Sequence, residues 1–341
     1  MAKKKICVAL QGGGAHGAFT WGVLDRLLED GSLDFEAVSG TSAGAMNGAV
    51  MVDALKRGGP QHARDRLERF WRSISDAGDS VFKPGRMLPP AFGPNSDWSP
   101  MALWSDALSL VWSPYNNLFY RNVLADVLGK ELPDFRALND HRTPHLFVCA
   151  TNVKTNRRKT FGPGKLGIGA LTASACLPTL FQSVEVDGEF YWDGGYMGNP
   201  ALSPLRSPSL TADLLIVWVN PMHRADVPTD ARAILDRANE ITFNATLVQE
   251  IAEIDAVNEL KGPRDSVRSP YKRIRLHEIK DDPALAQYGH ASKGNTDWDF
   301  LLELKEYGRE AAQQWLKTKL KHVGVQKSAD MHRLLSRLES C

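Results

Sequence analysis

Two glycine-rich turns, each between a short apolar run and a helical pattern, constrain the fold more than any other feature of this sequence. Residues 6–10 form the first apolar run, and a helical pattern follows at residues 18–29. Residues 35–39 form the second run, and another helical pattern extends from the second turn through Lys56. Apolar runs without polar alternation are typical of strands buried on both faces, and strands that alternate with helices build parallel sheets. The beginning of the chain therefore predicts an α/β fold.

The rest of the chain returns to this order after an interruption. Residues 58–120 are rich in Pro, Gly, Ser and Asn but also carry large apolar side chains, which is typical of an insertion and not of a linker. Strand-like runs are then predicted at residues 145–153, 214–220 and 272–279. Helical patterns are predicted at residues 120–129, 168–176, 230–260, 298–322 and 328–339. The sequence shows no internal repeat. Its length suits one large domain or a domain with an appendage, and a single α/β domain is expected.

Composition narrows the classes of protein. With 43% hydrophobic and 24% charged residues among 341, the chain has a globular composition. Its formal net charge of +1 gives no global attraction to nucleic acid, so no nucleic-acid partner is expected. The scattered Cys7, Cys149, Cys176 and Cys341 form no C-x-x-C pair and no zinc-like spacing with histidine, which favours a reducing cytoplasm and argues against a metal site. No apolar run reaches the roughly 18 residues of a spanning helix, so any membrane contact would be peripheral.

The second glycine turn contains a serine. Residues 40–44 read Gly-Thr-Ser-Ala-Gly, which fits the G-x-S-x-G pattern of a nucleophile elbow, with a predicted strand before it and a predicted helix after it. Small neighbours allow a sharp turn that exposes the hydroxyl, and the helix start directs unpaired N–H groups toward it. Ser42 is therefore the candidate nucleophile, with a plain Gly-Ser turn as the alternative.

The first glycine turn offers backbone donors. Gly12, Gly13 and Gly14 lack side chains, so their N–H groups have room to approach the oxygen of a ligand and form an oxyanion hole. A turn with no role beyond its shape is one alternative to this interpretation.

A dinucleotide site is the other alternative for this turn. Gly12, Gly14 and Gly17 satisfy G-x-G-x-x-G between a predicted strand and a predicted helix. That motif requires an acidic residue at the end of the next strand, about twenty positions on, to bind the ribose. Asp34 and Glu36 lie at the start of that strand instead, so the sequence disfavours this alternative.

A serine nucleophile needs a base, and none of the nine histidines lies in a loop of evident catalytic build. His223, just after a predicted strand, and His290, beside a glycine, are the least unsuitable. Asp193 begins an Asp-Gly-Gly turn directly after the strand-like residues 189–192, where a carboxylate would project at the end of a strand. Because Asp-Gly is also the commonest signal of a hairpin turn, a purely structural role for Asp193 stays open.

Together these elements resemble the patatin-like phospholipase family, in which a glycine-rich oxyanion loop, an early G-x-S-x-G and a later Asp-Gly-Gly occur in this order. The Ala-Ser-rich residues 173–178 and the pair Asn199-Pro200 fit the same pattern. The resemblance implies a three-layer α/β/α sandwich with a mainly parallel central sheet. It covers a catalytic core at residues 5–220, with a lid-like insertion at about 78–118, and residues 221–341 complete the domain with a strand and helices.

The resemblance also implies a Ser-Asp dyad without a catalytic histidine. Asp193 would take the proton of Ser42, which attacks an ester carbonyl, while the three glycines hold the oxyanion and water then releases the acyl group. This chemistry requires no cofactor and no metal. The sequence departs from the family at His16, where Arg or Lys often follows the glycines. His16 either places a pH-dependent charge beside the oxyanion hole or packs on the first helix.

Two stretches bear on the substrate. Residues 101–112 carry apolar side chains at helical spacing, which indicates either core packing or a lid with an acyl channel. Residues 261–280 carry an excess of basic side chains, which form either a solvated face or a docking site for anionic headgroups.

The sequence thus predicts a metal-independent lipid acyl hydrolase of the phospholipase A type, acting on a lipid or another acyl ester in the cytoplasm or at the periphery of a membrane. One alternative is a Ser-Asp-His esterase of the ordinary α/β-hydrolase fold, which usually places its nucleophile later in the chain. The other is a non-catalytic module that binds a dinucleotide or a lipid.

Overall fold

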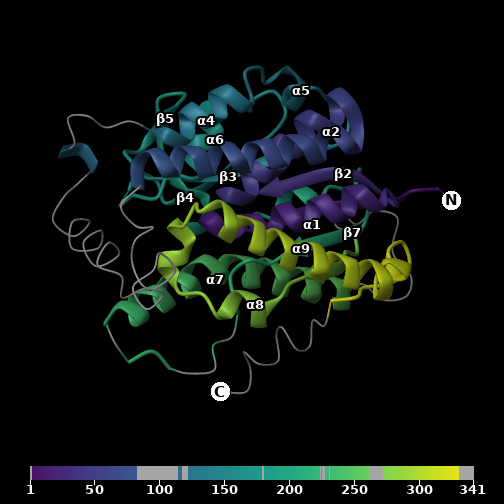
Figure 1. Cartoon of the computed structure of the whole chain (residues 1–341). Helices are drawn as coiled ribbons and strands as arrows, with labels where there is room; N and C mark the ends of the chain where they lie inside the picture. Colours follow the sequence, from purple (N-terminus) through teal and green to yellow (C-terminus); the bar gives the residue numbers. More distant parts are fainter. Residues whose placement is uncertain are drawn as a thin grey trace.

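A mixed eight-stranded sheet lies at the centre of the protein, and helices cover both of its faces (Figure 1). The computed structural model describes residues 2–82, 114–116, 122–178, 180–222, 224, 227–229, 231–260 and 272–329. The predicted insertion with its apolar stretch 101–112, the basic run at 261–280 and the helix at 328–339 lie wholly or mostly outside these residues. The predicted α/β/α sandwich with a mainly parallel sheet is confirmed.

The strands follow the order β5-β6-β3-β2-β1-β7-β8, and β4 pairs with β3. Their bounds are β1 Lys4–Leu10, β2 Leu33–Gly40, β3 His145–Asn152, β4 Arg157–Phe161, β5 Val184–Val186, β6 Glu189–Asp193, β7 Asp213–Val217 and β8 Arg275–Ile279. β1, β2, β3, β7 and β8 pair in parallel, whereas β4, β5 and β6 form antiparallel pairs at one end of the sheet. The sequence did not predict β4 or β5, because β4 is polar over most of its length and β5 has only 3 residues.

The helices are α1 Gly17–Asp30, α2 Ala43–Phe82, α4 Val123–Glu131, α5 Arg136–Asn139, α6 Ile168–Ser174, α7 Ala231–Leu260, α8 Asp282–Ala286 and α9 Trp298–Thr318. α2 is longer than predicted, because the chain resumes a helix after a kink at Gly59, whose φ of 79° and ψ of −168° are not helical. Pro60 follows this kink, and at the start of a helical segment a proline loses no hydrogen bond.

The alternation of side chains along β1 gives the sheet two hydrophobic cores. Ile6, Val8 and Leu10 are fully buried in the larger core, together with residues of α1, α2 and α9. Cys7 and Ala9 lie on the other face, in a smaller core with residues of α7. Burial of each large apolar side chain contributes about 1.5–3 kcal/mol to folding. Because helices cover both faces, the first strand is apolar at every position of its central run.

α1 and α9 cross in backbone contact. A Cβ on Gly22 of α1 would overlap the Lys305 carbonyl of α9, and a Cβ on Gly308 would overlap the Phe19 carbonyl. Only glycine fits at these two points of the crossing. The last described α-helix therefore covers the helix that follows the first glycine turn.

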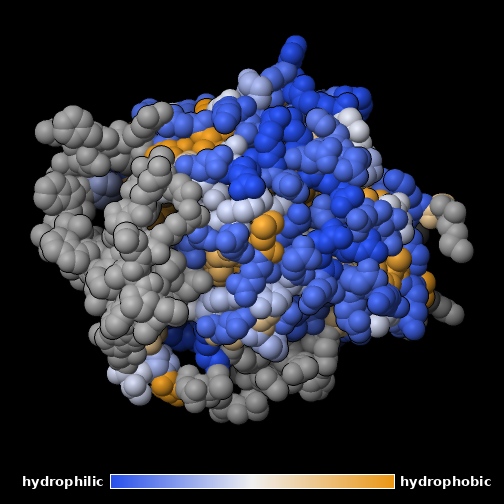
Figure 2. Space-filling model, in the orientation of Figure 1, coloured by the Kyte–Doolittle hydropathy of each residue, from blue (hydrophilic) through white to orange (hydrophobic). Residues whose placement is uncertain are grey.

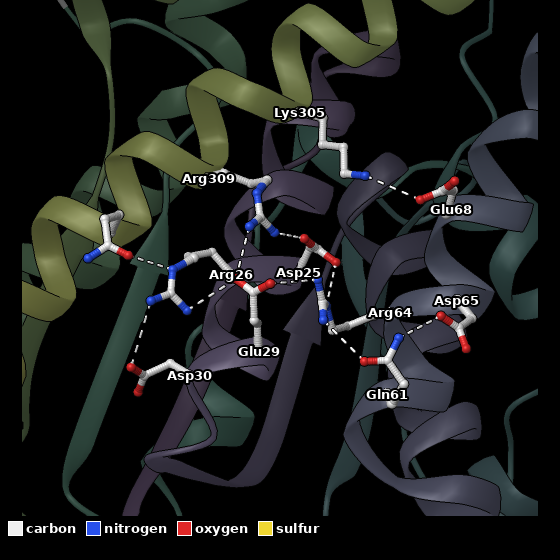
Figure 3. Close-up of polar contacts among 11 residues, drawn as sticks. Asp25, Arg26, Glu29, Asp30, Gln61, Arg64, Asp65, Glu68, Lys305 and Arg309 are labelled. Carbon is white, nitrogen blue, oxygen red and sulfur yellow. Dashed lines mark hydrogen bonds and ion pairs between the residues drawn. The ribbon is translucent and has the colours of Figure 1, made fainter.

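Charged residues join the exposed edge of this helix pair to α2 (Figure 3). Asp25 of α1 is 4% exposed and accepts hydrogen bonds from Arg64 of α2, at 2.8 Å, and from Arg309 of α9. Glu29, one turn later, accepts from the same two arginines, each at 2.9 Å. Shared partners and partial burial make this network stronger than an isolated surface ion pair, which contributes about 0–1 kcal/mol. The network joins α1 to both α2 and α9.

Hydrophilic residues cover most of the face shown in Figure 2, with apolar residues in small separate groups. Among the described residues, no helix combines the length and the apolar character needed to cross a membrane.

Candidate active site

The two glycine turns lie side by side because their strands are neighbours. β1 and β2 pair in parallel, and Leu10 at the end of β1 is the partner of Gly40 at the end of β2. The chain continues from Leu10 into the first glycine turn and from Gly40 to Ser42. A Cβ on Gly12 would lie 2.7 Å from the Cβ of Ser42, so the turns touch where a side chain would not fit. The structure thus brings together the predicted nucleophile and the predicted oxyanion loop.

Ser42 occupies a sharp turn between β2 and α2. Its φ is 53°, in the left-handed region that a residue with a side chain enters at a cost of roughly 1–2 kcal/mol. The Ser42 N–H donates to the Ser174 hydroxyl at 3.0 Å, and the Ser42 carbonyl accepts the Met46 N–H at 3.1 Å. These bonds hold the strained turn and leave Ser42 partly exposed. A strained turn with an accessible hydroxyl is the geometry of a nucleophile elbow.

Asp193 reaches the same place through the antiparallel part of the sheet. Val148 of β3 pairs with Gly40 of β2 on one side and with β4 on the other. Ala150, two residues further along β3, pairs with β4 again and with Asp193 of β6. Because a strand residue has one neighbour on each side, β6 lies on the β2 side of β3, just beyond the last residue of β2. The carboxylate is thereby placed next to the turn that holds Ser42.

The hairpin between β5 and β6 uses a different Asp-Gly pair. Asp187 and Gly188 connect the two strands with φ values of 53° and 79°, the backbone that a two-residue hairpin turn requires. Asp193 comes after the second strand, and its side chain accepts the Gly195 N–H at 2.7 Å. The turn signal at Asp193 therefore does not mark this hairpin.

Burial controls the charge of Asp193. The side chain is fully buried, and this burial raises its pKa from 3.8 to about 7. The Gly195 N–H and the nearby Ser42 hydroxyl lower the pKa, but to a smaller extent. Oδ2 is buried without a hydrogen bond of normal length to any described residue. One carboxylate oxygen is therefore left to accept a proton.

The three amides of the first glycine turn are not equivalent. The Gly12 N–H donates to the Asn199 side-chain oxygen at 2.7 Å and is already occupied. Within the part of the chain that the structure describes, the N–H groups of Gly13 and Gly14 have no acceptor. Of the three predicted oxyanion donors, two have no acceptor among the described residues and the third helps to hold the turn in place.

Comparison with known proteins assigns this chain to a family. The model of the family described as patatin-like phospholipase matches residues 8–206, more than half of the chain. The chain belongs to the patatin-like phospholipase family. It is accordingly a hydrolase, and lipid acyl esters are the substrate class at the level of the family.

The relatives of this patatin-like protein include uncharacterised NTE family proteins of Mycobacterium bovis and Mycobacterium tuberculosis. Each is 24% identical over 311 residues, which span 84% of this chain and 74% of the relative. Among solved structures, VipD from Legionella pneumophila is similar with a TM-score of 0.36 and 16% identity, over 99% of this chain and 80% of that one. Full-length ExoU from Pseudomonas aeruginosa, solved in complex with SpcU, gives a TM-score of 0.28 and 13% identity, over 92% and 53%.

His16 packs against the segment that contains Tyr288, Ser292 and Phe300. It is 2% exposed, and its Nε2 lies 2.7 Å from the Ser292 hydroxyl. Its ring meets Tyr288 edge to face at 6.1 Å between centroids, and its side chain does not cap α1. This environment favours the packing role over that of a charge beside the oxyanion hole.

This protein also contains a Ser-His-Asp arrangement, formed by residues of β7, β8 and the segment after α9. His277 Nδ1 lies 2.8 Å from the Ser328 hydroxyl and its Nε2 lies 3.0 Å from Asp213 Oδ1. Asp213 is the first residue of β7, whereas the glycine turns follow the ends of β1 and β2, so these three residues lie away from the candidate site. His223 and the side chain of His290 lie outside the described residues. No described histidine is hydrogen-bonded to the candidate nucleophile or base.

The residues around the two glycine turns bear on the metal and dinucleotide alternatives. No group of three or more His, Cys, Asp or Glu in the described ranges is placed to hold a metal ion. β2 ends at Gly40 and leads to Ser42, so the acidic residue that a dinucleotide site requires after this strand is absent.

Sequence reasoning missed the side chains that hold the patatin-like site together, namely Ser174, Asn199, Asn220 and Lys293. Ser174 and Asn199 lie in the segments that carry the family resemblance, so their place in the motif was a usable signal. Asn220 and Lys293 carry no such signal, because the bond from Asn220 to Gly12 and the approach of the Lys293 carbonyl to Gly14 depend on the folded chain.

Proposed function

We propose that this protein hydrolyses fatty-acyl esters through an acyl-enzyme on Ser42, with Asp193 as the base of a Ser-Asp dyad. The observation that supports this best is the position of a partly exposed serine, in a strained turn, next to a fully buried carboxylate with a free oxygen. A pKa of about 7 suits Asp193 to accept a proton and to return it near neutral pH.

In the proposed reaction, Asp193 Oδ2 accepts the hydroxyl proton of Ser42 while Ser42 Oγ attacks the ester carbonyl carbon. The tetrahedral intermediate collapses, the bond to the alcohol oxygen breaks, and Asp193 returns the proton to the leaving alcohol. A water molecule then attacks the acyl-serine and gives its proton to Asp193. Collapse of the second intermediate releases the fatty acid, and Ser42 regains its proton.

The free N–H groups of Gly13 and Gly14 are the proposed donors to the oxyanion in both intermediates. Loss of one such donor typically lowers kcat by about 10²–10³. Gly12, which the sequence placed with them, contributes by its close approach to Ser42 and by its bond to Asn199.

The test compares fluorophosphonate labelling and fatty-acid release in the native protein and in matched variants. We expect the label on Ser42, its loss in Ser42→Ala, and labelling at least about 100-fold slower in Asp193→Asn, because general-base assistance contributes about 10²–10⁴. Asp187→Asn is the control, since it changes the other Asp-Gly pair of the same strand region and should label like the native protein. Equal labelling rates in native protein and Asp193→Asn would assign the base to another residue.

A further inference from the structure

A segment far outside the family match packs against the oxyanion turn. The short 3-10 helix His290–Gly294 lies against the 3-10 helix Gly14–His16. The Lys293 carbonyl would overlap a Cβ on Gly14, and the Ser292 hydroxyl bonds to His16. The position of the Gly14 backbone therefore depends on a segment near the end of the described chain.

The side chain of Lys293 begins a series of hydrogen bonds that ends on the same turn. Its ammonium donates to Asn220 Oδ1 at 2.9 Å, and Asn220 Nδ2 donates to the Gly12 carbonyl at 2.8 Å. Asn220 is 2% exposed, and its backbone N–H is held by Gln11 Oε1 at 3.1 Å. One buried amide thus connects a cation to the oxyanion turn.

The Gly12 carbonyl belongs to the same peptide unit as the Gly13 N–H. A hydrogen bond accepted by the carbonyl polarises this unit and makes its N–H a stronger donor. The bond is strengthened further because the first donor of the series, Lys293, is charged and Asn220 is shielded from water. The Gly13 N–H is one of the two amides left free to meet an oxyanion.

We propose that Lys293 is a positioning residue for the oxyanion hole, acting through Asn220 to hold and polarise the Gly12–Gly13 peptide. This inference rests on the proposed acyl hydrolase function. Lys293, from a segment distant in the sequence, thus supplies the positive charge near the oxyanion turn that the sequence suggested for His16.

The effect should appear in the transition state and not in substrate binding, because the polarised N–H meets full negative charge only when the oxyanion forms. Lys293→Met keeps the length of the side chain and removes its charge and its donors. We expect kcat to fall about 10-fold with KM unchanged, which is less than the 10²–10³ typical of a lost oxyanion donor.

The experiment measures hydrolysis of a nitrophenyl ester by native protein, Lys293→Met, Asn220→Ala and the double variant. If Lys293 acts through Asn220, the double variant should be no slower than Asn220→Ala alone. A trifluoromethyl ketone, which forms an oxyanion adduct with the nucleophilic serine, should bind Lys293→Met about 10-fold more weakly. A non-hydrolysable ether analogue of the substrate should bind equally well, because it forms no oxyanion.

Lys305→Met is the matched control. Lys305 of α9 forms an ion pair with Glu68 of α2 at 3.3 Å, and its replacement should leave every readout at the native value. Equal weakening of ketone and ether binding, or additive losses in the double variant, would overturn the inference and leave the hydrolase proposal standing. A native protein that neither hydrolyses the ester nor takes a fluorophosphonate on Ser42 would overturn both.

Discussion

Replacing Asp193 with asparagine should remove activity and yet stabilise the fold at neutral and higher pH. Burial raises the pKa of Asp193 from 3.8 to about 7, so the folded state binds this proton more tightly than the unfolded state does. The stability that this proton provides is fully present below pH about 4 and is lost as the pH rises toward 7. Asparagine does not ionise, so the variant escapes this loss.

The size of the effect follows from linkage. Between pH about 5 and the pKa of about 7, the native protein should lose about 1.4 kcal/mol per pH unit relative to Asp193→Asn, or about 3 kcal/mol in all. Above the pKa the difference should stay constant. Any cost of burying the new NH₂ group is the same at every pH. The pH dependence of the difference in free energy of unfolding therefore reports the ionisation of Asp193 alone.

Urea unfolding of both proteins at a series of pH values from about 5 to about 8 measures this difference. Asp187→Asn serves as the control, because it replaces an exposed carboxylate in the hairpin turn before the same strand. A constant difference between Asp193→Asn and the native protein across this range would refute the reasoning. So would an Asp193→Asn protein with native activity.

Further predictions concern the same site and its surroundings. The kcat/KM of the native protein on an uncharged ester should rise through pH about 7 and then level off, because the base must be ionised; a flat profile from about pH 5 to 8 would contradict this. Gly12→Ala should fold but fail to label with a fluorophosphonate, since its Cβ would lie 2.7 Å from that of Ser42. Ser174→Ala, which leaves the Ser42 N–H without its acceptor, should lower the free energy of unfolding by about 1 kcal/mol in urea and slow labelling. His277→Gln should cost about 1–3 kcal/mol of stability in the same assay but leave the rate of hydrolysis unchanged, and a loss of activity would revive a histidine mechanism.

The order of β1, the glycine turns and β2 was predictable because it is local. An apolar run of strand length, glycines and a helical pattern each extend over only a few residues, and parallel pairing of successive strands is the usual arrangement. Because Leu10 and Gly40 are partners in this pairing, the turns that follow them lie together. The partial exposure and left-handed backbone of Ser42 agree with what the G-x-S-x-G pattern indicates.

The position of Asp193 was predictable only through the family resemblance, because it depends on long-range pairing. β2 and β6 pair with the same side of β3, so β6 lies beyond the end of β2. No local sequence pattern indicates that two strands pair with one side of a third. β4, which occupies the other side of β3, reads Arg-Arg-Lys-Thr-Phe and lacks the apolar character of a strand. The occupation of the Gly12 N–H by Asn199 likewise depends on contacts between distant segments.

The crossing of α1 and α9 bears on how this protein can be dissected. The family match ends at residue 206, but β1 pairs on its far side with β7, and α1 touches α9 through Gly22 and Gly308. A protein truncated after residue 206 would present β1 as a bare edge strand, with unpaired N–H and C=O groups that invite aggregation. The smallest piece that can be expressed or transplanted as a working unit therefore extends at least to the end of α9.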